Sequence, residues 1–420
     1  MKRGWSQTID RAPETIEGWR PTDDQLLLLR AALLDGDDAL AAWRVWSASA
    51  DVERLDQGSN RMLPLVSYNL DRLGVSDPLS ARLRGYRRQT WYKNQIWLSE
   101  MARFLAEFER AGLQTLVLKG TALVLLFYPD CGLRPMTDLD VLVRRDQARA
   151  AMSLLAELGW KANDEEMERR LRSANRANGA DASRDLASAR MTSAALERRI
   201  RQGHATAFVN SARLQLDLHW YVLSECREPD ADDDFWTDAV PVRIRNIATK
   251  ALNSTDTLLH VCVHGAKWCP VPPMRWVADA IMILRVAGDR IDWDRLVRLA
   301  RKRRLSLPLS RTLRYLSENM LAPIPQAVLL ELCDIPTTWS ERMEYRMFSR
   351  PRKVGENYSA LGVLWFVHRR LDFARGGIHS VLTFPVYLQH CFALEQFSDL
   401  PPFIFSKLVQ KGRQRLGWGN

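Results

Sequence analysis

The residues best suited to chemistry are two aspartates, Asp138 and Asp140, in the segment Met136-Thr137-Asp138-Leu139-Asp140-Val141-Leu142-Val143. Side chains of a β-strand alternate between its faces, so acids at positions i and i+2 of a strand project from the same face. Two carboxylates ~4 Å apart repel each other by roughly 4 kcal/mol at an effective dielectric of ~20. A divalent cation between them removes this repulsion, so the pair is a candidate metal site.

The Asp-x-Asp spacing alone is weak evidence, because the chain repeats it elsewhere. The other pairs lie in a turn, in an acidic loop, or ahead of a helix whose free amides they can cap: Asp35/Asp37, Asp230/Asp232, Asp232/Asp234 and Asp292/Asp294. Asp138 and Asp140 lack such an explanation, because strand-forming Leu and Val residues flank them and unpaired carboxylates are costly to bury. The alternative to a metal is an edge strand whose acids pair with Arg134, Arg144 or Arg145.

A third acid lies in the strand-like run Leu216-Asp217-Leu218-His219-Trp220. The same alternation places Asp217 and His219 on one face, with Leu216 and Leu218 on the other. His219 is either a functional contact or a structural partner of the acid. Three aspartates in strands suggest phosphoryl or nucleotidyl transfer.

The segment Lys119-Gly120-Thr121 follows a short apolar strand and begins a helix. Such a junction exposes backbone amides and a small hydroxyl, which suits a triphosphate over the helix N-terminus. The alternatives are a Gly120 that only eases the turn and a Lys119 that is an exposed strand end. Arg134 could neutralise phosphate through its forked donors, or form a salt bridge with Asp130 or Asp138.

The elements that must position these residues form an α+β fold. Residues 1–111 have helical periodicity, and residues 112–246 alternate short strands with helices. We expect a small mixed sheet in this core, with strands at 114–118, 137–143, 204–210 and 213–221 and a further one at 240–244. A polar stretch at 163–202 is interpreted as an insertion or lid, and residues 247–420 as a helical C-terminal domain.

The bulk properties favour an ordinary globular protein without a membrane span. The 420 residues are 46% hydrophobic and 26% charged, and the six cysteines are widely spread, as expected of reduced thiols. With no apolar segment behind the basic N-terminus, we expect a cytoplasmic location. The net charge of +10 is concentrated in the C-terminal half, which indicates either solvated helix faces or an anionic partner such as RNA.

The motifs between Leu116 and Trp220 resemble a known family when taken in order. A Lys-Gly-small turn, an apolar helix, a Tyr-Pro loop, the run Arg-Pro-Met-Thr-Asp-Leu-Asp-Val-Leu-Val and a later Asp-Leu-His-Trp follow one another. This order resembles the uncharacterised nucleotidyltransferases of the DNA polymerase β-like superfamily, which carry a Gly-Gly or Gly-Ser turn, an Asp-x-Asp pair and a third acid. The chain departs in having Thr121 where Ser is usual, which keeps the hydroxyl, and in its long polar insertion.

The resemblance implies an activity and a role for each residue. Asp138, Asp140 and Asp217 would be the catalytic acids and would hold two Mg²⁺ ions, with Asp217 also accepting the acceptor's proton or lowering its pKa. The residues expected to bind the nucleotide are Lys119, Gly120, Thr121, Arg134 and His219. The reaction would move an NMP from an NTP such as ATP to a hydroxyl of a small molecule, a protein or RNA, and release pyrophosphate. The alternative is a non-catalytic regulatory protein on the same fold that binds nucleotide or RNA.

Overall fold

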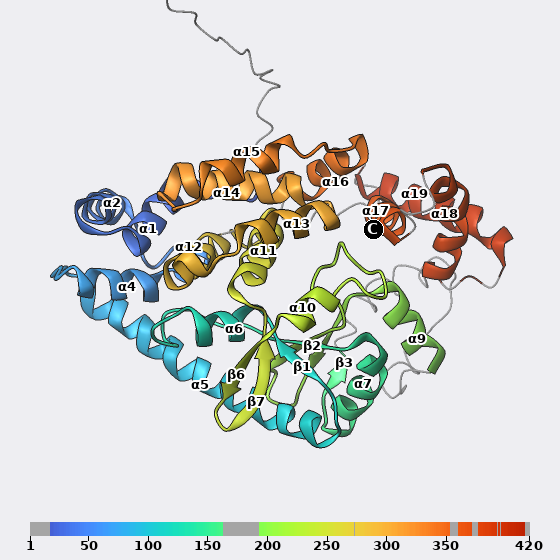
Figure 1. Ribbon diagram of the computed structural model, residues 1–420, viewed down its shortest axis with the longest axis horizontal. Coiled ribbons are helices and arrows are strands. Elements are labelled where there is room, and N and C mark those ends of the chain that lie inside the picture. Colours follow the sequence, from blue (N-terminus) through green and yellow to red (C-terminus); the bar gives the residue numbers. More distant parts are fainter. Residues whose placement is uncertain are drawn as a thin grey trace, which may run out of the picture. The chain divides into compact units, whose positions relative to one another are not determined.

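The structure is a computed structural model that describes residues 17–162, 193–272, 274–352, 360–371, 377–392, 394 and 396–415 (Figure 1). Its chain divides into two compact units, one of residues 1–76, 261–281 and 297–358 and one of residues 77–260, 282–296 and 359–420. The sequence-based domains 1–111, 112–246 and 247–420 are a different division of the chain and remain a prediction. Of the polar insertion predicted at 163–202, residues 163–192 lie outside the described residues, and the rest forms helix α9 (Ser193–Gln202).

The first unit is built from helices. Those that lie wholly within it are α1 (Asp23–Leu33), α2 (Gly36–Ser49), α3 (Gln57–Asn60), α4 (Leu63–Arg72), α14 (Ser306–Met320), α15 (Gln326–Asp334) and α16 (Trp339–Ser349). Helices α11 (Ser254–Gly265), α12 (Arg275–Ala287) and α13 (Trp293–Arg303) contribute residues to both units.

A tryptophan cluster fills the core of the first unit. The buried Trp19 ring meets Trp276 edge-on at 5.5 Å and Tyr315 at 5.7 Å between ring centroids. Its indole Nε1 donates a hydrogen bond to the Tyr345 hydroxyl at 3.0 Å, which satisfies the one polar atom that this large ring buries. Trp19, Trp276 and Tyr315 thus pack against one another in the interior of this unit.

The second unit contains a mixed sheet, as the sequence predicts. Its strands among the described residues are β1 (Thr115–Val117), β2 (Leu139–Val143), β3 (Lys161–Ala162), β4 (Ala205–Val209), β5 (Gln215–His219), β6 (Val240–Ile244) and β7 (Ile247–Ala251), in the order β3-β4-β5-β2-β1-β7-β6. β2 pairs in parallel with β5 and antiparallel with β1, so the two acidic strands are neighbours near the middle of the sheet. The sheet continues through β7, which lies beyond the end predicted for the core.

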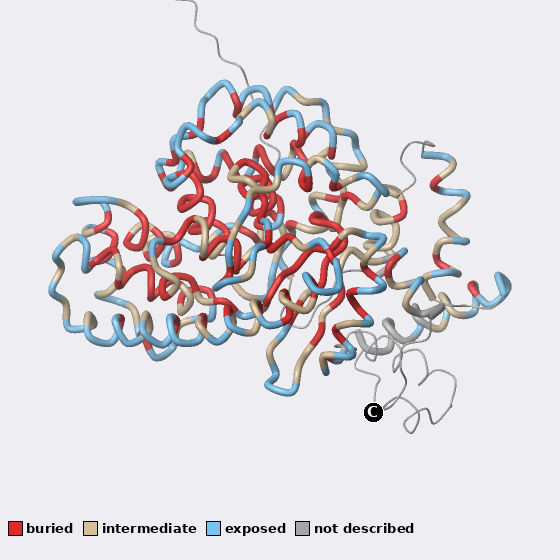
Figure 2. The backbone as a smooth tube through the Cα atoms, turned by 60° about the horizontal axis from the view of Figure 1, so that its bottom comes forward, coloured by how far each residue is buried: buried red, intermediate tan, exposed pale blue. Residues whose placement is uncertain are grey.

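Helices complete the second unit. They are α5 (Ser80–Arg110), α6 (Lys119–Leu126), α7 (Ala148–Glu157), α9, α10 (Asp233–Thr237), α17 (Ala360–Leu371), α18 (Gly377–Phe392) and α19 (Leu400–Arg415), with short 3-10 turns at Arg145–Gln147, Gly288–Arg290 and Phe397–Asp399. Figure 2 shows red and pale blue alternating along several helices, which is the pattern of elements that bury one side only. Among the described residues, no helix is both long and apolar enough to cross a membrane.

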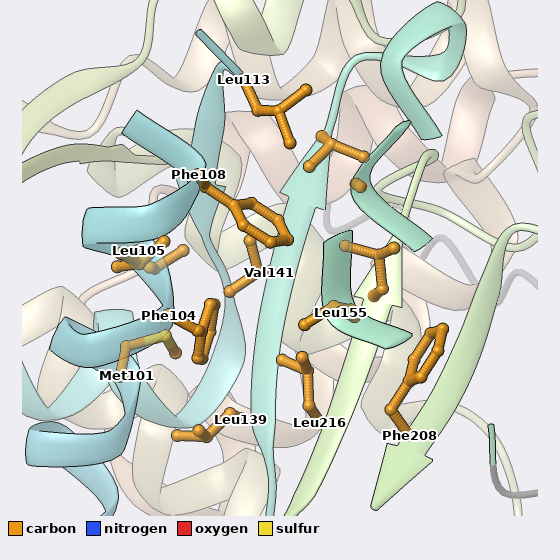
Figure 3. Packing of buried hydrophobic residues seen from close by; sticks show 14 of the residues in the cluster. Met101, Phe104, Leu105, Phe108, Leu113, Leu139, Val141, Leu155, Phe208 and Leu216 are labelled. Atoms are coloured by element: carbon orange, nitrogen blue, oxygen red, sulfur yellow. The ribbon is translucent and has the colours of Figure 1, made fainter. Parts of the chain in front are cut away.

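The hydrophobic core of the second unit lies on one face of the sheet. Figure 3 shows side chains of α5, among them Phe104 and Phe108, packed beside Val141 of β2, with Leu216 of β5 and Leu155 of α7 in the same cluster. Alternation along β2 therefore assigns Leu139, Val141 and Val143 to this apolar face. Asp140 must project from the opposite face.

Candidate active site

The register between β2 and β5 brings two of the predicted acids together. Asp140 is the direct partner of Asp217 in this parallel pair, and Leu142 is the partner of His219. Paired residues of neighbouring strands project from the same face, so both acids and His219 lie opposite the apolar core. One ligand atom from each of Asp140, Asp217 and His219 lies within 4.8 Å of the others, and this is the one such cluster of potential metal ligands among the described residues.

Burial differs sharply among these three residues. Asp140 is 1% exposed and His219 2% exposed, whereas Asp217 is only partly buried. On the neighbouring strand β4, Ala207 and Ala205 are the partners of Asp217 and His219. Their small side chains fill little of the space beside the acids on this face.

Lys119 is the cation that neutralises Asp140. Its Nζ lies 2.7 Å from Asp140 Oδ1, and His219 Nε2 lies 3.1 Å from the same oxygen. Lys119 begins α6 with φ of 42°, a left-handed conformation that is uncommon and costly for a residue with a side chain. The backbone amide of Leu118 also donates to Asp140 O at 3.0 Å, which ties the β1–α6 junction to β2.

The pKa values of the two paired acids, Asp140 and Asp217, are shifted in opposite directions. Burial by itself would raise the pKa of Asp140, but the Lys119 charge and the hydrogen bond to His219 hold it well below its usual range. Burial and the neighbouring Asp140 charge raise the pKa of Asp217, and Lys119 and His219 offset this only in part. For Lys119, burial opposes the charged form, yet the charges of Asp140, Asp217 and Asp138 outweigh it and raise its pKa.

Two buried atoms of the cluster lack a hydrogen-bond partner among the described residues. They are Asp140 Oδ2 and His219 Nδ1. Buried polar atoms are nearly always satisfied, so a carboxylate oxygen left without a donor beside a second carboxylate is suited to a cation. Oxygen donors of this kind are the ligands that Mg²⁺ prefers, and the residues present therefore fit a divalent metal.

Asp138 lies at the edge of this cluster. The strand begins at Leu139, two residues later than the sequence predicts, so Asp138 belongs to the preceding bend and not to the alternation of β2. It is partly exposed and accepts a hydrogen bond from the Thr137 hydroxyl at 3.1 Å. Its charge nevertheless acts on both Lys119 and Asp217, so it belongs to the same electrostatic environment.

The remaining residues expected to bind nucleotide lie around the start of α6. A Cβ added to Gly120 would come within 3.0 Å of Arg134 Nη1 and 3.4 Å of Met136 Cγ, so glycine permits the close approach of the loop before β2. Arg134 is buried at 6% exposure beside this turn. Thr121 is fully buried with its hydroxyl 3.9 Å from Met136 Sδ, so the hydroxyl faces the protein interior.

Asn94 of α5 is a positioning residue that the sequence analysis missed. Its fully buried side chain donates to Cys131 O at 2.6 Å and to Arg134 O at 2.8 Å, and accepts from Met136 N at 3.1 Å. The loop that leads into Asp138 is thereby fixed to α5. A signal existed in the sequence, because Asn94 falls in the helical spacing of the buried residues Leu83, Thr90, Leu98 and Met101.

A comparison with protein families identifies the class of protein. The sequence model of a family described as uncharacterised nucleotidyltransferase matches residues 58–320. This range covers more than half of the chain and includes every candidate site residue named above. The chain belongs to this nucleotidyltransferase family. A search of curated proteins found no match.

Proposed function

We propose that the chain is a metal-dependent nucleotidyltransferase that moves an NMP from an NTP to a hydroxyl acceptor. Membership of the family supports nucleotidyl transfer in general. The observation that carries the finer proposal is the direct pairing of Asp140 with Asp217, together with the buried Asp140 Oδ2 that has no partner among the described residues. Asp140 and Asp217, with Asp138 beside them, would hold two Mg²⁺ ions.

The reaction consists of one in-line displacement. The acceptor oxygen attacks the α-phosphorus, a new phosphorus–oxygen bond forms, and the bond from that phosphorus to the bridging oxygen breaks, which releases pyrophosphate. Bound Mg²⁺ would supply charge neutralisation at the entering and leaving oxygens. The acceptor loses its proton as it attacks, and Asp217, the less buried of the paired acids, is placed to accept it.

The cationic residues act on the phosphates. The Lys119 ammonium lies beside Asp140 and can neutralise negative charge on a bound triphosphate. Arg134 contributes a buried guanidinium next to Gly120. The burial of the Thr121 hydroxyl against Met136 supports a packing role for this side chain in place of the predicted nucleotide contact.

The test is transfer of label from an NTP labelled at the α-phosphate, in the presence of Mg²⁺, to a pool of hydroxyl acceptors. Asp140→Asn keeps the size of the side chain and removes its charge, and we expect transfer to fall by at least about 100-fold, because a catalytic charge is worth several kcal/mol. Asp146→Asn is the matched control, since Asp146 is exposed just beyond the end of β2. Metal-dependent nucleotide binding without transfer in the wild type would instead support the regulatory alternative.

A further inference from the structure

The N-terminal half of α5 presents an exposed face that is both basic and aromatic. Between Ser80 and Ser99 the chain has five cationic residues and no acidic one. Arg87 is paired with the acid of the adjoining loop, Asp130, in a salt bridge of 2.7 Å, and the others are Arg82, Arg84, Arg88 and Lys93. Trp91 is 48% exposed, Tyr92 65% and Ile96 45%. Exposed apolar side chains that are grouped together, here on neighbouring positions of one helix, are typical of interaction sites.

These residues lie along one side of the helix. Arg84, Arg88, Tyr92 and Ile96 follow one another in steps of four, so they form a row on the same side, with Trp91 adjacent. Arg84, Arg88 and Lys93 are exposed. The opposite side holds the buried residues that pack into the protein. From Arg84 to Ile96 the row extends over ~18 Å at 1.5 Å per residue.

A second element adds to this surface. Arg245, in the turn between β6 and β7, donates to Gln95 Oε1 at 3.1 Å and to Ser99 Oγ at 2.8 Å. These contacts hold its guanidinium against the end of the row on α5. Arg243, also exposed, lies two residues earlier in the chain. We call the surface formed by Arg84, Arg88, Trp91, Tyr92, Ile96 and Arg245 the α5 face.

The α5 face adjoins the loop that leads to the acids. A Cβ placed on Gly132 would lie 3.0 Å from Trp91 Cβ, so the loop backbone touches the helix at this residue. In the next helical turn Asn94 holds Arg134 O of the same loop. A ligand stacked on Trp91 would therefore lie beside the loop that ends at Asp138.

The mixture of groups on the α5 face determines which partner fits. A lipid surface requires a wide continuous apolar stripe with cations at its margins, whereas here two neighbouring rings lie between Arg84 and Arg88 at one end and Arg245 at the other. This combination suits a single-stranded polynucleotide, because cations track the phosphates and flat rings stack on the bases. We propose that the α5 face binds a single-stranded polynucleotide. A role of this ligand as the acceptor in the transfer reaction rests on the proposed function.

The test is binding of a fluorescein-labelled oligo(U) RNA and of an oligo(dT) DNA, measured by anisotropy without NTP. Stacking on an aromatic side chain contributes ~1–3 kcal/mol per base, so the double variant Trp91→Ala/Tyr92→Ala should weaken binding by about tenfold or more. Arg88→Gln should lower the slope of log affinity against log salt by about 0.7. Tighter binding of the RNA or of the DNA shows which kind of polynucleotide the α5 face prefers, and either result supports the proposal.

The controls separate stacking from general charge attraction and from catalysis. Trp91→Phe/Tyr92→Phe should retain binding, because the rings remain, and Trp339→Ala, which removes an exposed ring on α16, should have no effect. Asp140→Asn should bind like the wild type, so loss of transfer and loss of binding are distinguishable. The proposal is overturned if the alanine variant binds both oligonucleotides as tightly as the wild type, or if the wild type binds neither oligonucleotide.

Discussion

The paired acids Asp140 and Asp217 should respond to the same substitution with opposite changes in stability. Asp217 has a raised pKa because its charge is disfavoured by burial and by Asp140, so Asp217→Asn should stabilise the metal-free protein. Ligand atoms of the two lie within 4.8 Å, where two charges repel by roughly 3–4 kcal/mol at an effective dielectric of ~20. Lys119 and His219 offset most of this repulsion, which leaves a gain of about 1 kcal/mol for the variant.

Asp140→Asn should have the opposite effect. The buried carboxylate is held charged by Lys119 and His219, and its replacement leaves a mostly buried ammonium without its nearest counter-charge. Breaking a buried pair in this way costs about 3 kcal/mol. For a unit of this size, about 1 kcal/mol corresponds to ~2–4 °C in Tm, so Asp217→Asn should melt a few degrees higher and Asp140→Asn about 6–12 °C lower.

The pH dependence of these effects has a defined sign. Because the pKa of Asp217 is raised in the folded state, its charge lowers the stability by the full amount above that pKa. This loss vanishes as the pH falls to 3.8, the ordinary pKa of an aspartate. The advantage of Asp217→Asn should therefore disappear near pH 4. The contribution of Asp140 is present above 3.8 and is lost as pH falls towards its lower folded-state pKa. Thermal unfolding followed by circular dichroism in EDTA measures the stability of both variants at each pH. Changes in Tm of the same sign for the two variants would refute the electrostatic reasoning.

Three further substitutions test the site and the unit that contains it. Asn94→Ala should lower the free energy of unfolding by about 2–4 kcal/mol, measured in urea, and also lower kcat, because three backbone groups of the loop lose their partner. Arg295→Lys should lower the free energy of unfolding by about 2–4 kcal/mol, since the guanidinium contacts both oxygens of the fully buried Asp256 at 2.8 Å. The control Arg298→Lys, on the exposed side of α13, should change it by less than ~0.5 kcal/mol. Lys119→Met should gain more Tm from Mg²⁺ than the wild type does, because the ion replaces the lost ammonium; an equal gain in both proteins would contradict this.

The sequence predicts the elements of the site better than their contacts. Alternation of apolar and acidic residues is strong in β2 and β5, so both strands and the shared face of Asp217 and His219 could be recognised. The direct pairing of Asp140 with Asp217 could not, because strand register depends on how segments 77 residues apart come together. For the same reason the Lys119–Asp140 ion pair was not predicted.

Two further features could not be predicted from the sequence: the residue at which β2 begins, and the exposure of the rings on α5. Asp138 was placed within the strand, but the bend that precedes Leu139 depends on how the loop is held by Asn94, a contact between distant parts of the chain. The aromatic residues Trp91 and Tyr92 were not recognised as a surface, because helical periodicity alone does not distinguish a large ring that packs from one that is exposed.

The central claim is that the acids of β2 and β5 catalyse nucleotidyl transfer. The most direct measurement follows NTP labelled at the α-phosphate in one reaction and at the γ-phosphate in another, with Mg²⁺ and an acceptor pool. The account predicts that α-label enters the acceptor and γ-label leaves in pyrophosphate, and that Asp140→Asn and Asp217→Asn abolish both while Asp146→Asn does not. Transfer of the γ-label to the acceptor, or full activity of either active-site variant, would contradict it.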